Sequence, residues 1–188
     1  MDHYLQILAI PNLEIEQSVV CSELMQAIHQ MLPTFEGRIG LTFPLYKPKR
    51  TLGPVIRAHG SKEDLIDLSL QLHSNRTVTN YSILEEIKPV PKNIVRHVRY
   101  HRHQVRNHSR LRRMKKRQEA QGTWSAEKEA HIKHTIAIRI ELPFVKLKSA
   151  STDQEFFLFI NRTQTKKPDE GLFNAYGLSL KTATLPMF

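Results

Sequence analysis

Residues 3–33 read HYLQILAIPNLEIEQSVVCSELMQAIHQMLP, and this stretch decides the fold because it joins a strand to an amphipathic helix. Residues 3–10 are rich in apolar, β-forming side chains, and Pro11-Asn12 interrupts them, which predicts a strand. From about Glu16 apolar residues recur at spacings of three and four, which predicts a helix that ends before Pro33. The apolar positions of this helix are Val20, Leu24, Ile28 and Met31.

The residues that follow this pair continue the alternation of strands and helices. Ile39, Leu41 and Phe43 alternate with polar or small residues, which predicts a half-buried strand, and residues 55–58 predict a shorter one. Ser61 stands three residues before Asp64 in a variant of the capping box, which predicts a helix through Leu65, Leu68 and Leu72. Residues 78–83 predict a further strand. The order strand, helix, strand, strand, helix, strand is that of the ferredoxin-like, or split βαβ, fold.

The chain changes character after Pro89-Val90-Pro91, so we expect a domain boundary there. Residues 1–92 would form the ferredoxin-like domain and residues 93–188 a C-terminal α+β domain, which gives an α+β fold class overall. In the second domain residues 94–105 alternate in polarity and predict a strand whose one face carries Val98, Tyr100, Arg102 and Gln104.

Two helices and three strands are predicted in the rest of the second domain. Ser109 is a suitable N-cap for a helix that continues to Gln121 and stops at Gly122, and Ser125 opens a second, short helix. Ile136, Ile138 and Ile140 at a period of two predict a strand, as do residues 144–147 and 156–160.

The positive charge of the chain is confined to one segment. The 188 residues include 28 basic and 18 acidic side chains, and residues 96–117 hold eight arginines, two lysines and four histidines without an Asp or Glu. Removing those ten bases leaves 18 basic against 18 acidic residues, so the rest of the chain is neutral. A localised excess of this kind indicates a polyanion site, and nucleic acid is the polyanion that we expect.

The basic segment combines two capabilities. On a helix, Arg110, Arg113 and Arg117 would share one face, and Leu111 and Met114 would form an apolar stripe that could hold the helix against the body of the protein. Guanidinium groups bind phosphates in pairs of hydrogen bonds and also take the edge of guanine, while Arg102 and Gln104, two apart on a strand, suit a guanine and an adenine edge. The predicted contacts to nucleic acid from this segment are Arg102, Gln104, Arg106, Arg110, Arg112, Arg113, Lys116 and Arg117. A solvated charged face, a disordered basic arm and a DNA ligand are the alternatives that charge alone leaves open.

Several function classes are not expected from the composition. No stretch approaches the apolar length of a membrane span, and the chain opens on a strand instead of a basic leader, so we expect a soluble protein without a secretion signal. The lone Cys21 lies in an apolar helical pattern, which suits a buried position and a reducing cytoplasm. His101-x-His103 and His131-x-x-His134 are partial metal motifs without accompanying cysteines or carboxylates, so we expect neither a functional metal nor a cofactor.

A set of sequence motifs spans nearly the whole chain. They are Met1-Asp2-His3-Tyr4-Leu5, His29, Arg102-x-Gln104, the arginine-rich helix, residues 142–152, Tyr176-Gly177-Leu178-Ser179 and Pro186-Met187-Phe188. Together and in this order they resemble the CRISPR repeat-processing endoribonuclease of type I-F systems, although the basic helix carries Lys115 and Lys116 where more arginine is usual in that family.

The resemblance implies a metal-independent cut in CRISPR precursor RNA at the 3′ base of the repeat stem-loop. The adjacent 2′-hydroxyl would attack the phosphate and leave a 2′,3′-cyclic phosphate and a 5′-hydroxyl. The protein would be a monomer when free, would stay bound to its product hairpin and would join the other subunits of the type I-F surveillance complex. An RNA-hairpin-binding subunit without activity is the alternative.

The resemblance also implies roles for individual residues. His29 would accept the proton of the 2′-hydroxyl, which an imidazole can do at neutral pH, and Ser149 would hold that hydroxyl, a role that Ser151 could share. Tyr176 would orient the histidine, and Phe156 would stack on the base pair at the foot of the stem. Without the family, His29 suits a structural hydrogen bond and Tyr176 a core or interface position. Phe157 and Phe159 follow Phe156, and one of the three is expected in the core.

Overall fold

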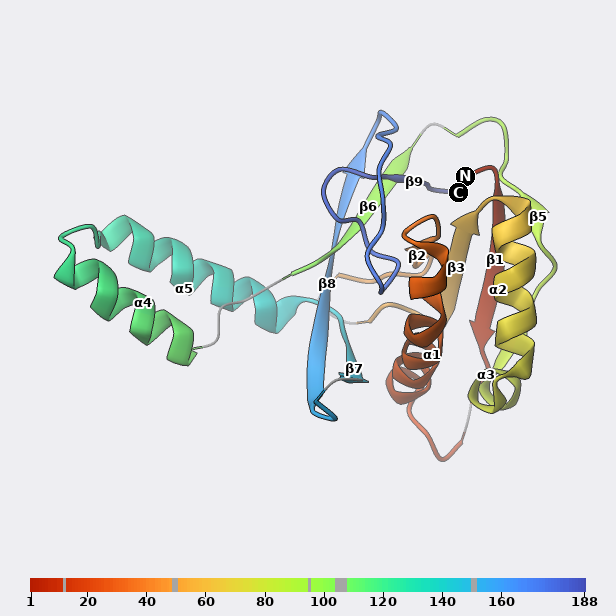
Figure 1. Ribbon diagram of the computed structural model, residues 1–188, viewed down its shortest axis with the longest axis horizontal. Helices are drawn as coiled ribbons and strands as arrows, with labels where there is room; N and C mark the ends of the chain where they lie inside the picture. The colour runs from red at the N-terminus through yellow and green to blue at the C-terminus, as the bar shows by residue number, and fades with distance from the viewer. Residues whose placement is uncertain (12, 49–50, 95, 104–107, 150–151) are drawn as a thin grey trace.

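The computed structural model describes residues 1–11, 13–48, 51–94, 96–103, 108–149 and 152–188, arranged as in Figure 1. For residues 108–112, 132–133 and 135–140 the description covers only their place in a helix. The fold is a mixed α+β arrangement of two antiparallel sheets, so the predicted α+β class is confirmed.

The first sheet is built from strands of the first half of the chain. Its strands are β1 (His3–Ala9), β2 (Gly40–Thr42), β3 (Val55–Gly60), β4 (Ser82–Leu84) and β5 (Lys88–Pro89). They lie in the order β2-β3-β1-β4, with β5 also on β1, and every neighbouring pair is antiparallel. The strand β1 thus lies inside the sheet, and its Leu5 and Ile7 are fully buried.

Three α-helices accompany this sheet, and side-chain caps explain where the second and third begin. Helix α1 covers Gln17–Met31 and passes into a 3-10 turn at Leu32–Phe35, which contains Pro33. Helix α2 covers Lys62–Ser74, and Ser61 caps it by accepting a 3.1 Å hydrogen bond from the backbone N–H of Asp64. Helix α3 covers Arg76–Tyr81, and Asn75 caps it in the same way through Val78.

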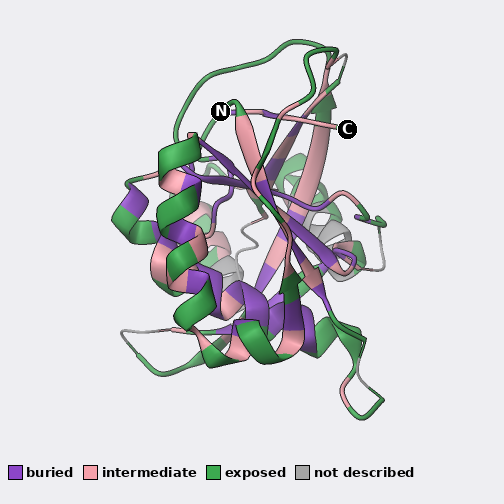
Figure 2. Ribbon diagram, turned by 90° about the vertical axis from the view of Figure 1, so that its right-hand side faces the viewer, coloured by how far each residue is buried: buried purple, intermediate pink, exposed green. Residues whose placement is uncertain are grey.

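The second sheet uses strands of the second half. It comprises β6 (His97–Arg102), β7 (Phe144–Lys148), β8 (Glu155–Thr165) and β9 (Leu185–Pro186) in the order β7-β8-β6-β9, again antiparallel. One continuous core joins the two sheets, because Leu147 and Ile160 of the second half belong to the same buried cluster as Leu24 and Ile28 of α1. Figure 2 shows the buried residues gathered in the middle of the molecule, with the exposed residues around them.

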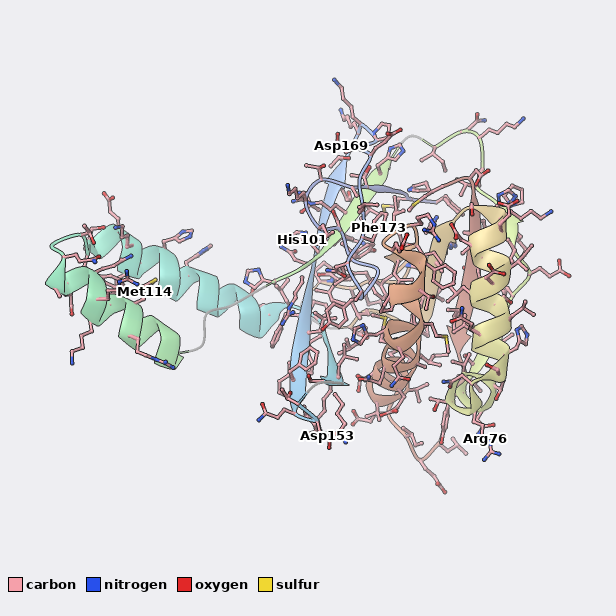
Figure 3. The ribbon with its side chains drawn as sticks, in the orientation of Figure 1. Arg76, His101, Met114, Asp153, Asp169 and Phe173 are labelled. Carbon is pink, nitrogen blue, oxygen red and sulfur yellow. The ribbon has the colours of Figure 1, made fainter. Side chains whose placement is uncertain are left out.

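A helical hairpin extends away from the sheets (Figure 1). It consists of α4 (His108–Ala120) and α5 (Ala126–Glu141). The Lys115 ammonium ties the two helices together, because it lies 3.0 Å from the Glu129 carboxylate and 5.5 Å from the centre of the Trp124 ring. Figure 3 shows Met114 on the side of α4 that faces α5.

The elements of the first half differ from the sequence predictions at two places. Residues 78–83, predicted as one strand, divide into the end of α3 and the start of β4, because the Asn75 cap starts a helix that the β-forming residues Val78 and Thr79 do not prevent. The strand predicted as half-buried around residues 39–43 covers only Gly40–Thr42. Ile39, Leu41 and Phe43 are buried as expected, but the alternate residues Gly40 and Thr42 are buried too, so both faces of the strand are covered.

Two more predictions are wrong in the hairpin. Ile136, Ile138 and Ile140 were expected in a strand but lie in α5, because Ser125 caps the helix and no Gly or Pro interrupts residues 126–142. Helix α4 begins at His108, so Ser109 lies inside the helix instead of capping it. The expected stop is confirmed, since α4 ends at Ala120 and Gly122 has a φ of +64°.

Two further expectations from the sequence concern the lone cysteine and a membrane span. Cys21 is buried, as predicted, and burial raises the pKa of its thiol to about 11. Within the described part of the chain, none of the helices combines the length and apolar character that a membrane span requires.

A buried histidine couples the stability of the first sheet to pH. His59 on β3 is 0% exposed, its Nε2 lies 3.0 Å from the Thr42 hydroxyl, and burial, with a smaller effect of the Arg57 charge, lowers its pKa to about 3. The folded protein therefore keeps this ring neutral, while the unfolded chain takes up a proton below about pH 6.5.

We predict that His59 destabilises the protein as the pH falls through that window. Between pH 6.5 and 5 the free energy of unfolding should drop by about 2 kcal/mol more in the parent chain than in a His59→Gln variant, which keeps a polar partner for Thr42. Urea denaturation at each pH measures the difference. Parallel pH dependences of the two proteins would contradict the prediction.

Candidate functional site

The side chain of His29 is held in one orientation at the end of α1. Its Nδ1 lies 2.7 Å from the backbone carbonyl oxygen of Ala175, and its ring stacks on Tyr176 with centroids 4.2 Å apart and planes 24° apart. Because a carbonyl oxygen only accepts hydrogen bonds, Nδ1 carries the proton in the neutral ring. The other nitrogen, Nε2, is then the one that can accept a proton.

The loop that presents Ala175 and Tyr176 is held by the Asn174 side chain and by a backbone hydrogen bond to β2. The Asn174 side-chain oxygen accepts hydrogen bonds from the N–H groups of Tyr176 at 2.9 Å and Leu178 at 3.1 Å. Gly177 has a φ of +68°, and its carbonyl accepts a 2.7 Å bond from Leu41 on β2. The first sheet therefore fixes the loop that orients His29.

Aromatic rings and one cation extend the site from the histidine. Phe156 meets Tyr176 edge to face at 6.3 Å, and the Arg102 guanidinium lies 5.8 Å from the Phe156 ring and 5.9 Å from the Tyr176 ring. Arg102 is exposed at the end of β6, so its guanidinium borders the rings while remaining open to a ligand. Cations over aromatic faces are favourable and also pre-orient the guanidinium.

Ser149 lies at the turn between β7 and β8. Its N–H donates to the Gln154 carbonyl at 2.9 Å, and its own carbonyl accepts from the Asp153 N–H at 2.9 Å. Asp153 adopts the left-handed conformation with a φ of +55°, and Figure 3 shows it at the tip of this turn. Alternation along the strand puts Ser149 on the same face as the buried Val145 and Leu147, which is the face toward α1.

A positively charged cavity of about 630 Å³ opens beside these residues. Arg99, Arg102 and Lys181 line it together with Tyr176, and no carboxylate is among its described lining residues. The Arg99 guanidinium is fixed by a 2.7 Å hydrogen bond to the Lys181 carbonyl. Burial, with smaller effects of Arg99 and His103, lowers the pKa of His101 in the same wall. The basic lining of this cavity favours an anionic ligand beside Tyr176, the ring that stacks on His29.

The structure brings four of the predicted site residues into one cluster, namely His29, Tyr176, Phe156 and Arg102. Arg113, Lys116 and Arg117 are exposed on α4, in the projecting hairpin. Arg110 and Arg112 also belong to α4, but their side chains lie outside the description, as do Gln104, Arg106 and Ser151 altogether.

Residues 4–188 match the sequence profile of a family described as CRISPR-associated protein (Cas_Csy4). The chain belongs to this Csy4 family. Two proteins named CRISPR-associated endonuclease Cas6/Csy4 are similar to it over 100% of both chains. One, from Escherichia coli strain UTI89, is 33% identical over 196 residues, and the other, from Pseudomonas aeruginosa strain UCBPP-PA14, is 35% identical over 194 residues. The resemblance identified from the sequence, and with it the assignment as an enzyme of the endonuclease class, is confirmed.

One aromatic expectation for this Csy4 chain is wrong. None of Phe156, Phe157 and Phe159 is fully buried. Leu158 and Ile160, both 0% exposed, fill the inward face of β8, and Phe156 lies on that face near the start of the strand, where it packs half-buried against the core. Phe157 and Phe159 lie on the opposite face of the strand. Phe157 is 49% exposed and contacts Phe144 edge to face at 5.1 Å.

The partial metal motifs His101-x-His103 and His131-x-x-His134 do not gain a third ligand in the part of the chain that the structure describes. No cluster of three His, Cys, Asp or Glu side chains occurs among the described residues.

Sequence reasoning missed the backbone that orients His29. Ala175 acts through its carbonyl, which leaves no trace in the sequence, whereas Asn174 and Gly177 form an Asn-x-x-Gly turn that the sequence does signal.

We predict that Gly177→Ala destabilises this Csy4 chain by about 2 kcal/mol or more relative to Gly122→Ala. Both glycines have a left-handed φ, but a Cβ at position 177 would lie 2.3 Å from Leu41 Cγ, while one at position 122 would meet nothing within 4 Å. The difference therefore isolates the contact with Leu41. Urea denaturation checks it, and equal losses in the two variants would show that only backbone strain matters.

Proposed function

We propose that this Csy4 chain is a sequence- and structure-specific, metal-independent endoribonuclease. It cleaves CRISPR precursor RNA at the 3′ base of the repeat stem-loop and leaves a 2′,3′-cyclic phosphate and a 5′-hydroxyl. The observation that carries the proposal is the orientation of His29, whose Nδ1–H is committed to the Ala175 carbonyl at 2.7 Å. The neutral ring therefore offers Nε2 as a base, without a metal.

Attack of the 2′-hydroxyl on the adjacent phosphate needs a base and a nucleophile that is held in line with the leaving oxygen. Nε2 of His29 takes the proton of the 2′-hydroxyl, the O2′–P bond forms, and the P–O5′ bond breaks. The departing 5′ oxygen then takes up a proton and becomes the 5′-hydroxyl. Ser149 holds the attacking hydroxyl in line, with Ser151 as a further contact, because alignment lowers the barrier of such an intramolecular attack.

The aromatic cluster would position both the base and the RNA. The stack of Tyr176 on His29 at 4.2 Å keeps the imidazole from rotating, which supports the orienting role of Tyr176. Phe156 is half-buried beside Tyr176 and so has part of its surface open to stack on the last base pair of the stem. Arg102, next to both rings, would read a guanine edge, with Gln104 as its partner on an adenine.

The projecting hairpin would clamp the groove of the RNA stem. Arg113 and Arg117 lie one helical turn apart on α4 and are exposed together with Lys116. Lys115 points elsewhere, toward Glu129 at 3.0 Å and Glu119 at 3.9 Å, and these partners raise its pKa. The phosphate contacts therefore fall on Arg106, Arg110, Arg112, Arg113, Lys116 and Arg117.

The architecture supports a division of labour between two domains. The strand order β2-β3-β1-β4 with two helical crossovers is the ferredoxin-like pattern, so we assign residues 1–92 to that fold and residues 93–188 to the RNA-hairpin-binding domain. We further propose that the free protein is a cytoplasmic monomer. After the cut it keeps its hairpin and becomes a subunit of the type I-F surveillance complex.

The assignment of His29 predicts a loss of chemistry without a loss of binding. In EDTA the parent chain should cut its cognate repeat hairpin, while His29→Ala should cut about 10²- to 10⁴-fold more slowly and bind the uncut hairpin with unchanged affinity. Single-turnover cleavage and filter binding measure the two quantities.

His73→Ala is the matched control, because His73 is exposed and its hydrogen bonds to described residues stay within its own helix, at 2.8 Å from the Ser69 carbonyl and 3.4 Å from the Ser69 hydroxyl. It should cut like the parent. Full cutting by His29→Ala would remove His29 from the mechanism, and intact RNA with every protein would indicate a binding subunit without activity.

A further inference from the structure

We propose that Ser22 and Gln26 of α1 are positioning residues that set the placement of His29 relative to Ser149. Both side chains bind the backbone of β7, the strand that ends immediately before Ser149. The inference rests on the proposed function, since it concerns the geometry of the same cleavage reaction.

The strand β7 lies at the edge of the second sheet and has backbone groups directed away from its partner. The Pro143 carbonyl accepts a hydrogen bond from the Ile160 N–H, and the Ser149 N–H donates to the Gln154 carbonyl. Residues 143 and 149 thus direct these groups toward β8 or the turn that leads into it. In an antiparallel pair the alternate residues, here Lys146 and Lys148, direct their N–H groups outward. An edge strand needs partners for such groups.

Helix α1 supplies these partners. Lys146 N donates to the Ser22 hydroxyl at 3.1 Å, and Lys148 N donates to the Gln26 side-chain oxygen at 2.7 Å. The Ser22 hydroxyl gives its own proton to the Ser18 carbonyl at 2.9 Å, which leaves its oxygen oriented as an acceptor. Two side chains of the first half thus dock a strand more than 120 residues away in sequence.

The spacing of the two elements explains why this docking sets a register. One helical turn from Ser22 to Gln26 advances about 6.0 Å, and two strand residues advance about 6.6 Å, so successive outward N–H groups meet successive turns. His29 lies on the same helix face, about 4.5 Å beyond Gln26, and Ser149 lies about 3.3 Å beyond Lys148. His29, the proposed base, and Ser149, the serine proposed to hold the 2′-hydroxyl, therefore lie at similar positions along the contact between α1 and β7.

Apolar packing alone would not fix this register. Val145 and Leu147 hold β7 in the core, but hydrophobic contact is non-directional and tolerates a small slide of the strand along the helix. Hydrogen bonds lose strength steeply when donor and acceptor are misaligned. Loss of the Gln26 acceptor should therefore disturb alignment at the reacting atoms more than it disturbs folding.

The test compares a variant that loses the acceptor with one that keeps it. Gln26→Met has a similar length but cannot accept the Lys148 N–H, whereas Gln26→Glu retains an oxygen at the same place. Gln30→Met makes the same substitution at the next turn, where the residue is exposed. Ser22→Ala gives a second, smaller removal of an acceptor if Gln26→Met folds poorly. Single-turnover cleavage, hairpin affinity and the urea midpoint are measured for each.

We expect Gln26→Met to cut about 10- to 100-fold more slowly than the parent while its hairpin affinity stays within about twofold. Gln26→Glu and Gln30→Met should cut within about threefold of the parent, and Ser22→Ala should fall in the same direction as Gln26→Met. Parent-like cutting by both Gln26→Met and Ser22→Ala, or a loss that follows affinity or stability, would overturn the positioning role. Absence of cutting by the parent itself would instead overturn the proposed function.

Discussion

The docking of helix α1 on the edge strand β7 holds the two halves of the molecule together at the site. Two backbone N–H groups of β7 reach acceptors on α1 at 3.1 and 2.7 Å, and Val145 and Leu147 pack beneath them into the shared core. His29 comes from the first half and Ser149 from the second, so neither half contains the proposed reaction centre by itself. The loop at residues 174–178 completes this arrangement, because it binds Leu41 of the first sheet and His29 at once.

Charge and chemistry are separated in this fold. Of the ten Arg and Lys residues at positions 96–117, two lie on β6 and six on α4 of the projecting hairpin. His29 lies in the remainder of the chain, which carries no net charge. Arg102 is the link between the two regions, since it ends β6 and borders the rings of Phe156 and Tyr176. An enzyme built in this way can bind an RNA stem through many phosphates and place only one of them beside the proposed base, His29.

The sequence predicted those parts of the fold that local signals control. The cap at Ser61 and the apolar spacing of α1 fixed two helices, and both are present. Residues 136–140 were misread because alternate isoleucines suit a strand, whereas the Ser125 cap and the absence of breakers before Pro143 extend a helix through them. The contact of His29 with Ala175 spans 146 residues and ends on a backbone carbonyl, so no side-chain pattern could reveal it. The roles proposed for His29 and Tyr176 came from the family resemblance, not from periodicity.

A crystal structure of the chain with its repeat hairpin, carrying a 2′-deoxy nucleotide at the cleavage site, tests the central claim most directly. Our account predicts that the 2′ carbon lies where an added hydroxyl would reach His29 Nε2 within about 3.2 Å, with Ser149 on its other side and Nδ1 still bonded to Ala175. A scissile phosphate bound away from His29, or a histidine turned so that Nε2 meets the Ala175 carbonyl, would contradict it.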